Sequence, residues 1–174
     1  MFFNMFKFIP KGSYVGLNSS VESSNLSQLQ VESDNFDVVV KQGSDSKVEY
    51  KLFIKEGFLL SDMIFDVNCN ASQIAFTIKT LKNNMSGTLE LLIPKSLIDI
   101  NIICINGDIN LSKVFVSSLN LRTINGDIKI ITLDGDYKIS YNTVNGDISN
   151  KKKSLSSSSN RIACSSVNGD ITIV

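Results

Sequence analysis

The stretch N-G-D-I at residues 106–109 decides the fold, because the same four residues return three more times in the chain. The later copies begin at Asn125, Asn145 and Asn168, so the steps between copies are 19, 20 and 23 residues. Self-similarity at a nearly fixed spacing is the mark of a repeat architecture, whose units bury their apolar faces against one another. We therefore predict that these units stack.

The residues around the motif repeat as well. The residue before each Asn is apolar, and the one before that is small: Ile105, Ile124, Val144 and Val167 follow Cys104, Thr123, Thr143 and Ser166. Asn-Gly is a strong turn signal, because Gly adopts positive φ freely and Asn tolerates it. The predicted structural turns are Asn106, Gly107, Asp108, Asn125, Gly126, Asp127, Asn145, Gly146, Asp147, Asn168, Gly169 and Asp170.

Each unit reads as β-structure, because apolar and polar residues alternate with period two. Leu119, Leu121 and Thr123 share one face of a segment, and Ile128 and Ile130 share a face after the turn. At about 3.3 Å per residue, ~20 residues make one coil of short strands and turns. We predict an all-β, single-stranded, parallel β-helix-like solenoid with ~20-residue coils. An array of antiparallel hairpins is the alternative, since Asn-Gly is common in two-residue hairpin loops.

The regular coils occupy residues 101–174, and the same alternation, without the clean turn, extends upstream. We predict one domain over residues 25–174, with irregular coils at 25–100 and strand-loop-strand at 51–66. Asn35-Phe36-Asp37-Val38 looks like a worn copy of the motif, and Phe resists positive φ, so that turn should differ in geometry. Residues 1–24 are expected to be a cap or disordered.

Composition narrows the function. Lys plus Arg and Asp plus Glu both number 17, and the net charge of zero argues against nucleic acid as a partner. There is no histidine, which removes the commonest catalytic base and zinc ligand. Cys69, Cys104 and Cys164 form no C-x-x-C pair and fit thiols in a reducing compartment. No segment has the length of a membrane span or a convincing signal peptide, so we expect a cytoplasmic protein.

The chain resembles the putative-adhesin family of β-strand-repeat proteins, a bacterial domain of unknown function. The resemblance covers about residues 25–174 and is carried by the opening at 29–38, by Leu-Leu-Ile-Pro at 91–94 and by the T/S-x-N-G-D-I coils. It implies a β-solenoid and no catalytic activity. Family members are often tethered or exported, and this chain departs from them in lacking such a segment.

The four Asp residues of the motif raise an electrostatic question, because like charges on neighbouring strands repel. Asp108, Asp127, Asp147 and Asp170 could accept backbone N–H bonds of their own turns, bind calcium through carboxylate oxygens, or hold raised pKa values. The backbone bonds are the preferred interpretation. We expect no resident metal or cofactor.

We expect a non-enzymatic structural or interaction module that binds protein or glycan through a β-face. The alternative is a carbohydrate-active enzyme, a glycoside hydrolase or lyase, in which Asp127, Asp147, Asp134 and Asp136 supply paired carboxylates. An identical Asp in every coil argues for structure, since a catalytic site is made once. The last motif runs on to Val174, so we also expect a homo-oligomer formed through the ends of the solenoid.

Overall fold

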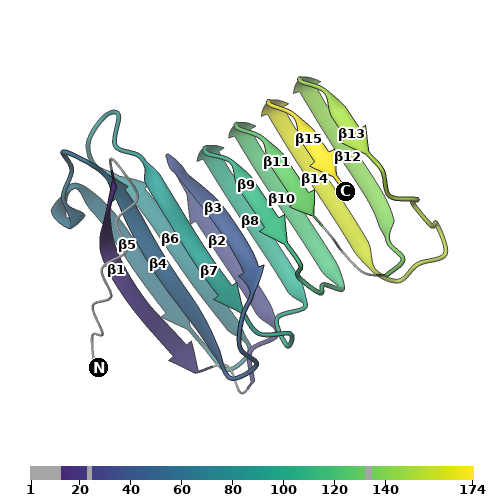
Figure 1. Ribbon diagram of the computed structural model, residues 1–174, viewed down its shortest axis with the longest axis horizontal. Helices are drawn as coiled ribbons and strands as arrows, with labels where there is room; N and C mark the ends of the chain where they lie inside the picture. Colours follow the sequence, from purple (N-terminus) through teal and green to yellow (C-terminus); the bar gives the residue numbers. More distant parts are fainter. Residues whose placement is uncertain (1–12, 23–24, 132–134) are drawn as a thin grey trace.

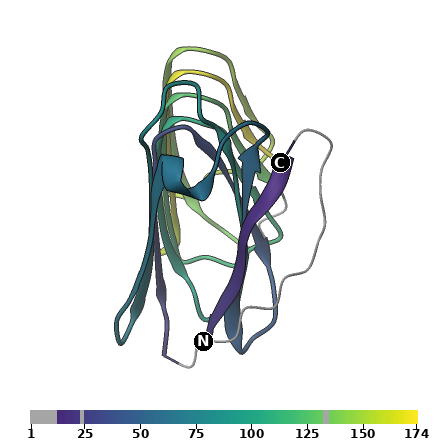
Figure 2. The same ribbon diagram turned by 90° about the vertical axis from the view of Figure 1, so that its left-hand side faces the viewer.

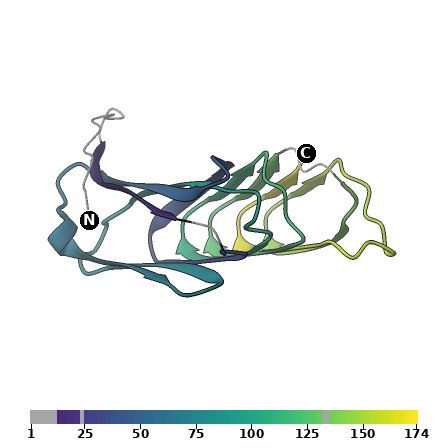
Figure 3. The same ribbon diagram turned by 90° about the horizontal axis from the view of Figure 1, so that it is seen from below.

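The computed structural model describes residues 13–22, 25–131 and 135–174, and over these residues the chain is all-β. Two mixed sheets face each other as layers, as Figures 1 and 3 show. The strands are β1 (Ser13–Glu22), β2 (Gln28–Ser33), β3 (Phe36–Gln42), β4 (Lys47–Lys55), β5 (Met63–Cys69), β6 (Gln73–Thr80), β7 (Gly87–Ile93), β8 (Asp99–Asn106), β9 (Ile109–Ser112), β10 (Ser118–Asn125), β11 (Ile128–Ile131), β12 (Lys138–Asn145), β13 (Ile148–Asn150), β14 (Arg161–Asn168) and β15 (Ile171–Ile173). A 3-10 turn, η1, spans Leu60–Asp62. In this described part, no helix is long and apolar enough to cross a membrane.

The chain moves from one sheet to the other at each N-G-D corner. One sheet has the order β1-β4-β7-β3-β9-β11-β15-β13, and the other has the order β12-β14-β10-β8-β2-β6-β5. Strands that precede a corner pair in parallel with one another, and so do strands that follow one. This parallel pairing rules out the array of antiparallel hairpins, in which each turn would join two neighbours of one sheet.

The corners lie over one another in register. Asn125 is paired with Asn106 on one side and with Asn168 on the other, and Asn168 is paired with Asn145. The same holds after the corner, where Ile128 lies between the equivalent isoleucines of two neighbouring units. The two strands that flank an N-G-D corner, one in each sheet, therefore form one level of a common stack.

The order of the levels differs from the order of the chain. The last pair, β14 and β15, lies between β10/β11 and β12/β13, so the final N-G-D-I unit is inside the stack (Figure 1). Likewise, β2 and β3 lie between β6/β7 and β8/β9. The expectation that the unit ending at Val174 forms an exposed end is therefore wrong, because that end is formed by β12 and β13.

The long 23-residue step follows from this rearrangement. After β13 the chain must pass around β12 to reach β14 on its inner side. The intervening segment follows the outer edge of β12, where the hydroxyl of Ser154 accepts a hydrogen bond from the N–H of Ile139 (2.9 Å) and the N–H of Leu155 donates to the carbonyl of Tyr137 (2.9 Å). The extra residues therefore carry the chain past one level of the stack, whereas an insertion at a corner would only enlarge a turn.

The core lies between the sheets and is built from the inward half of each alternating strand. Leu119, Leu121, Ile128 and Ile130 are at most 1% exposed. Each stacks on aliphatic or cysteine side chains of the neighbouring levels, since equivalent positions are paired in register. Burial of such side chains stabilises the fold by about 1.5–3 kcal/mol each relative to exposure, which makes this column the main support of the repeats.

The opposite end of the stack is built differently. β1 and β5 are antiparallel edge strands, paired with β4 and β6, and η1 lies across this end in Figure 2. Tyr50 and Phe76 meet edge-on, with ring centroids 5.2 Å apart, and Phe65 packs beside them. The prediction of strand-loop-strand for residues 51–66 is confirmed. Of the segment predicted as a cap or disordered, residues 13–22 form β1, and residues 1–12 and 23–24 lie outside the described part.

Candidate functional site

The Asn side chains of the corners form a continuous ladder along the stack. Each amide nitrogen donates to the amide oxygen of the next Asn, at 2.6–2.8 Å: Asn145 to Asn168, Asn168 to Asn125, Asn125 to Asn106 and Asn106 to Asn35. The amide of Asn35 then donates to the hydroxyl of Thr80 on β6 (2.9 Å), so Thr80 is the residue at this end of the ladder. The ladder has a direction, so within the described residues the amide oxygen of Asn145, at the β12/β13 end, receives no bond from another Asn.

The Asp residues form a second ladder beside the first. The backbone N–H of Asp108 donates to the carboxylate of Asp37 (2.9 Å), and the same bond recurs from Asp127 to Asp108, from Asp170 to Asp127 and from Asp147 to Asp170. The carboxylates of Asp108, Asp127 and Asp170 are therefore satisfied by the turn of the neighbouring level and not, as predicted, by their own turns, and within the described residues Asp147 at the end of the file accepts no such bond. A charge-assisted bond to a backbone N–H stabilises the ionised form and offsets repulsion along the file.

A third set of bonds uses the small residue two positions before the Asn. The hydroxyls of Thr123, Ser166 and Thr143 donate to the carbonyl of the Gly in the neighbouring corner, at 2.9–3.1 Å. The sequence predicted only small packed side chains here. The hydroxyl at this place in three of the four copies was the signal for the bond, and Cys104 fills the place in the fourth.

The Gly of the motif is required by close approach and not by positive φ. A Cβ on Gly126 would lie 2.3 Å from the carbonyl oxygen of Gly107, and a Cβ on Gly169 would lie 2.0 Å from that of Gly126. Among the four motif glycines only Gly169 has a positive φ, of 154°. Any side chain here would therefore collide with the backbone of the next level.

Phe36 takes the Gly position in the first corner, and its N–H donates to the hydroxyl of Ser33 (3.2 Å), whereas a motif Gly such as Gly107 donates to the Asn carbonyl of the neighbouring level (3.0 Å). Its φ is not positive, and Asn35 and Asp37 still join both ladders. The turn nevertheless differs in geometry, as predicted, because β3 begins at Phe36 itself, two positions earlier in the motif than β9. Phe36 is fully buried and its register partner is Gly87, which leaves room for the ring. Burial raises the pKa of Asp37 above its usual 3.8, the N–H of Asp108 opposes this, and the charge of Asp108 adds to the rise.

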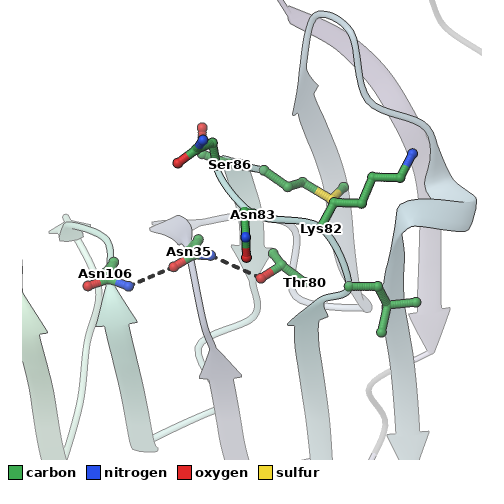
Figure 4. A pocket seen from close by; sticks show the side chains of 9 residues that line it. Asn35, Thr80, Lys82, Asn83, Ser86 and Asn106 are labelled. Atoms are coloured by element: carbon green, nitrogen blue, oxygen red, sulfur yellow. Dashed lines mark hydrogen bonds between the residues drawn. The ribbon is translucent and has the colours of Figure 1, made fainter.

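A pocket of about 610 Å³ lies where the Asn ladder begins (Figure 4). Thr80 occupies the Asn position of its level, since it bonds to Asn35, and Gly87 occupies the Gly position, opposite Phe36. These two positions are adjacent in an N-G-D-I corner, so residues 81–86 are inserted here. The insertion forms one wall of the pocket, and the Asn ladder forms another.

Two anchors hold the inserted loop. Met85 is fully buried, and the ammonium of Lys82 lies 2.6 Å from the carboxylate of Asp62. The hydrogen bond from Lys82, together with the N–H of Leu59, lowers the pKa of Asp62 below its usual 3.8. Because the charge of Lys82 is matched by Asp62, the polar groups that remain for a ligand are neutral.

The pocket offers amides and hydroxyls. Asn83 and Asn84 are exposed, and neither their amides nor the hydroxyl of Ser86 has a hydrogen-bond partner within the described ranges. Figure 4 shows Asn83 directed toward the Asn35–Thr80 pair and Lys82 directed away from it. Asn84 has a φ of 60°, a left-handed conformation that Asn tolerates better than most residues. The repeats gave no signal for this pocket, because the inserted loop at 81–86 lies outside the four copies.

The proposed catalytic cluster is not assembled. Asp170 lies between Asp127 and Asp147 in the ladder, and Asp136 precedes the other end of β12, roughly 25 Å from the corner along an eight-residue strand. Asp134 lies outside the described residues. Over the part of the chain that the structure describes, no group of three or more Cys, Asp or Glu side chains could hold a metal ion, the four Asp suggested for calcium included.

The cysteines are free thiols. Cys104 and Cys164 are buried in the core, whereas Cys69 is exposed on β5. Burial raises the pKa of both buried thiols to about 12, and the charges of Asp37 and Asp108 add to the effect at Cys104. A thiol with such a pKa is a poor nucleophile at neutral pH, in agreement with a packing role.

Comparisons with known proteins identify solved structures of similar fold. No protein-family profile matches the sequence, and neither does a curated protein. Among solved structures, a putative cell adhesion protein from Clostridium sporogenes ATCC 15579 superposes with a TM-score of 0.50 at 9% identity, covering 90% of this chain and 97% of that one. A putative adhesin from Bacteroides fragilis NCTC 9343 gives a TM-score of 0.34 at 10% identity, covering 91% and 96%. The Clostridium structure shows that this all-β fold occurs in a known protein.

Proposed function

We propose that the chain is a non-enzymatic, adhesin-like interaction module with β-solenoid architecture, and that it binds a neutral glycan at the pocket beside the Asn ladder. The stacked, parallel corners support the solenoid description. The name of the Clostridium protein, which shares the fold, supports an adhesin-like role.

The observation that carries the ligand class is the chemistry of the pocket wall. Asn83, Asn84 and Ser86 present amide and hydroxyl groups that no described residue satisfies. An amide both donates and accepts, which matches the paired donor and acceptor character of a sugar hydroxyl. The single charged side chain in the lining, Lys82, is paired with Asp62, which favours an uncharged ligand. A few convergent polar groups on a preformed pocket are typical of ligand sites.

The use of the carboxylates supports a role without catalysis. A glycosidase needs one carboxylic acid and one carboxylate free to act on the bond. In the ladder, Asp37, Asp108, Asp127 and Asp170 each accept a backbone N–H of the next level. They are committed to the fold, so we propose that none of them is a catalytic group.

The test is a glycan array probed with the intact chain, followed by calorimetric titration of any glycan that binds. One hydrogen bond contributes about 0.5–1.5 kcal/mol, so Asn83→Ala should weaken the affinity about threefold to tenfold. Asn68→Ala on β5 is the matched control, because Asn68 is also exposed and lies outside the pocket. Absence of any bound glycan, or equal losses in the two variants, would overturn the proposal.

A further inference from the structure

The two ends of the stack are finished differently. At the β1/β5 end, antiparallel strands, η1 and the Tyr50–Phe65–Phe76 cluster close the core. At the β12/β13 end the core positions are open: Ile148 is 41% exposed and Tyr141 43%, whereas their counterparts Ile128 and Leu121 are fully buried. A repeat array needs a cap on its terminal unit, because the last level otherwise leaves its apolar side chains and strand edges to water.

The segment after β13 caps only part of this end. Ser154 and Leu155 bond to the outer edge of β12 at Tyr137 and Ile139. Alternate residues of a strand direct their N–H and C=O groups to the same side, so Tyr141 and Thr143 present theirs outward. Within the described residues, nothing pairs with that stretch of edge.

Charge is distributed unevenly over the same level. Asp147 lies at the corner, and its carboxylate has no donor among the described residues. Lys138, Lys151 and Lys153 lie at the other end of the level, where β12 begins and β13 has ended. The described part of the chain gives none of these lysines an ion pair. Asp136 also lies at that end but is outnumbered by the lysines, so the level is acidic at its corner and basic at its other end.

We propose that the β12/β13 end binds a second copy of this chain, through antiparallel pairing of β12 across a two-fold axis. Tyr141 of each copy then exchanges hydrogen bonds with Thr143 of the other, and Asn142 faces its own counterpart on the axis. This direction places the Asp147 corner of one copy near Lys138 of the other. The exposed core residues Tyr141 and Ile148 become covered in both copies.

The alternatives are less favourable on the same observations. Head-to-tail stacking would set β12 against the closed end, which already carries antiparallel edge strands and buried aromatic rings. A two-fold arrangement that aligned the corners would set Asp147 against Asp147, and like charges opposed on paired strands are destabilising. The antiparallel arrangement is isologous, so it closes at two copies and forms no filament.

Cross-linking tests the geometry. Facing residues of a non-hydrogen-bonded antiparallel pair have Cα atoms about 4.5 Å apart, which is within the range of a disulfide. With Cys69 replaced by Ser to remove the exposed native thiol, Asn142→Cys should give a covalent dimer on mild oxidation. Ser140→Cys on the same strand is the matched control and should stay monomeric, because it faces Val144 of the other copy.

Analytical ultracentrifugation of the intact chain tests the assembly itself. We expect a dimer at about 100 μM, weakened when salt is raised from about 0.1 M to about 1 M, which shortens the Debye length from about 10 Å to about 3 Å. Tyr141→Glu should shift the dimer to monomer. Ile64→Glu, a matched change on exposed β5 at the closed end, should not.

Several results would overturn this inference. A monomer at all concentrations would do so, and so would equal cross-linking at residues 140 and 142 or dissociation by Ile64→Glu. Circular dichroism shows whether the Tyr141→Glu variant is folded. If it is not, the cross-linking result decides whether the proposed dimer forms. Glycan binding is measured separately, so loss of one proposal leaves the other standing.

Discussion

The two halves of the molecule reach stability by different routes. In residues 25–100 the levels differ from one another, and the end is closed by aromatic rings, a 3-10 turn and antiparallel strands. In residues 101–174 every level repeats the Asn and Asp bonds over an aliphatic column, and three of the four levels add the hydroxyl bond. The first half therefore adds aromatic contacts at its closed end to an aliphatic core, whereas the second repeats equivalent contacts from level to level.

The largest effect is expected where a single ring closes the end. Phe76 is fully buried against Tyr50 and Phe65, so Phe76→Ala should lower the free energy of unfolding by about 3–5 kcal/mol. Urea denaturation measures this loss in the free energy of unfolding. Phe115→Ala is the control, because Phe115 is 50% exposed and should cost less than about 1 kcal/mol. Similar losses in the two variants would contradict this account of the closed end.

The next effect separates inner levels from the outer one. Gly126→Ala sets a Cβ against the carbonyl of Gly107 and should destabilise by about 3 kcal/mol. Gly146→Ala meets the carbonyl of Gly169 at nearly the same distance, but its level has a neighbour on one side only and can move away. We expect a loss of about 1 kcal/mol there. If thermal unfolding gave equal losses, the difference between inner and outer levels would disappear.

Removal of one rung of the ladder should cost less. Asn125→Ala breaks two amide bonds and Asn145→Ala breaks one, so we expect losses of about 2 and about 1 kcal/mol. Urea denaturation of both variants beside Asn68→Ala provides the scale. A larger loss for Asn145 than for Asn125 would mean that the ladder is not the source of the stability.

The smallest effect is a dependence on pH at the junction of the two halves. Because burial raises the pKa of Asp37, the folded chain binds a proton more tightly than the unfolded chain. Stability should therefore fall as the pH rises from 3.8 through the folded pKa, and Asp37→Asn should remove this fall. The measurement is the free energy of unfolding between about pH 4 and pH 7. Asp45→Asn in an exposed loop is the control, and a wild-type slope retained by Asp37→Asn would refute the assignment.

The corners were the predictable part of the fold, because their signal is local and repeated. The same Asn, Gly and Asp recur with small and apolar flanks, and these residues meet only if the levels stack. The sequence could not order the levels, because the Asn145 and Asn168 units present the same corner to any neighbour. One signal was present: Asn150 holds the place that Leu111, Ile130 and Ile173 fill, as suits an outermost level.

The pocket could not be predicted, because it depends on a departure from the pattern. Thr80 and Gly87 mark the ends of a six-residue insertion, but only the register with Asn35 and Phe36 identifies them as corner positions. The close approach that requires the motif glycine was hidden for the same reason. In a sequence, a glycine that is required because a neighbouring carbonyl lies close to it cannot be distinguished from one that is required by a positive φ.

The interleaved order of the levels has a consequence for biosynthesis. Residues 137–150 leave the ribosome before residues 151–174 and carry the same corner, so they can first dock on β10/β11 in the place that β14/β15 finally occupies. At about 5–20 residues per second, the competing strands follow roughly 1–5 s later. Residues 137–150 must then either leave this position free or be displaced from it, so the last step of folding is a strand exchange between two units that share the V-N-G-D-I corner.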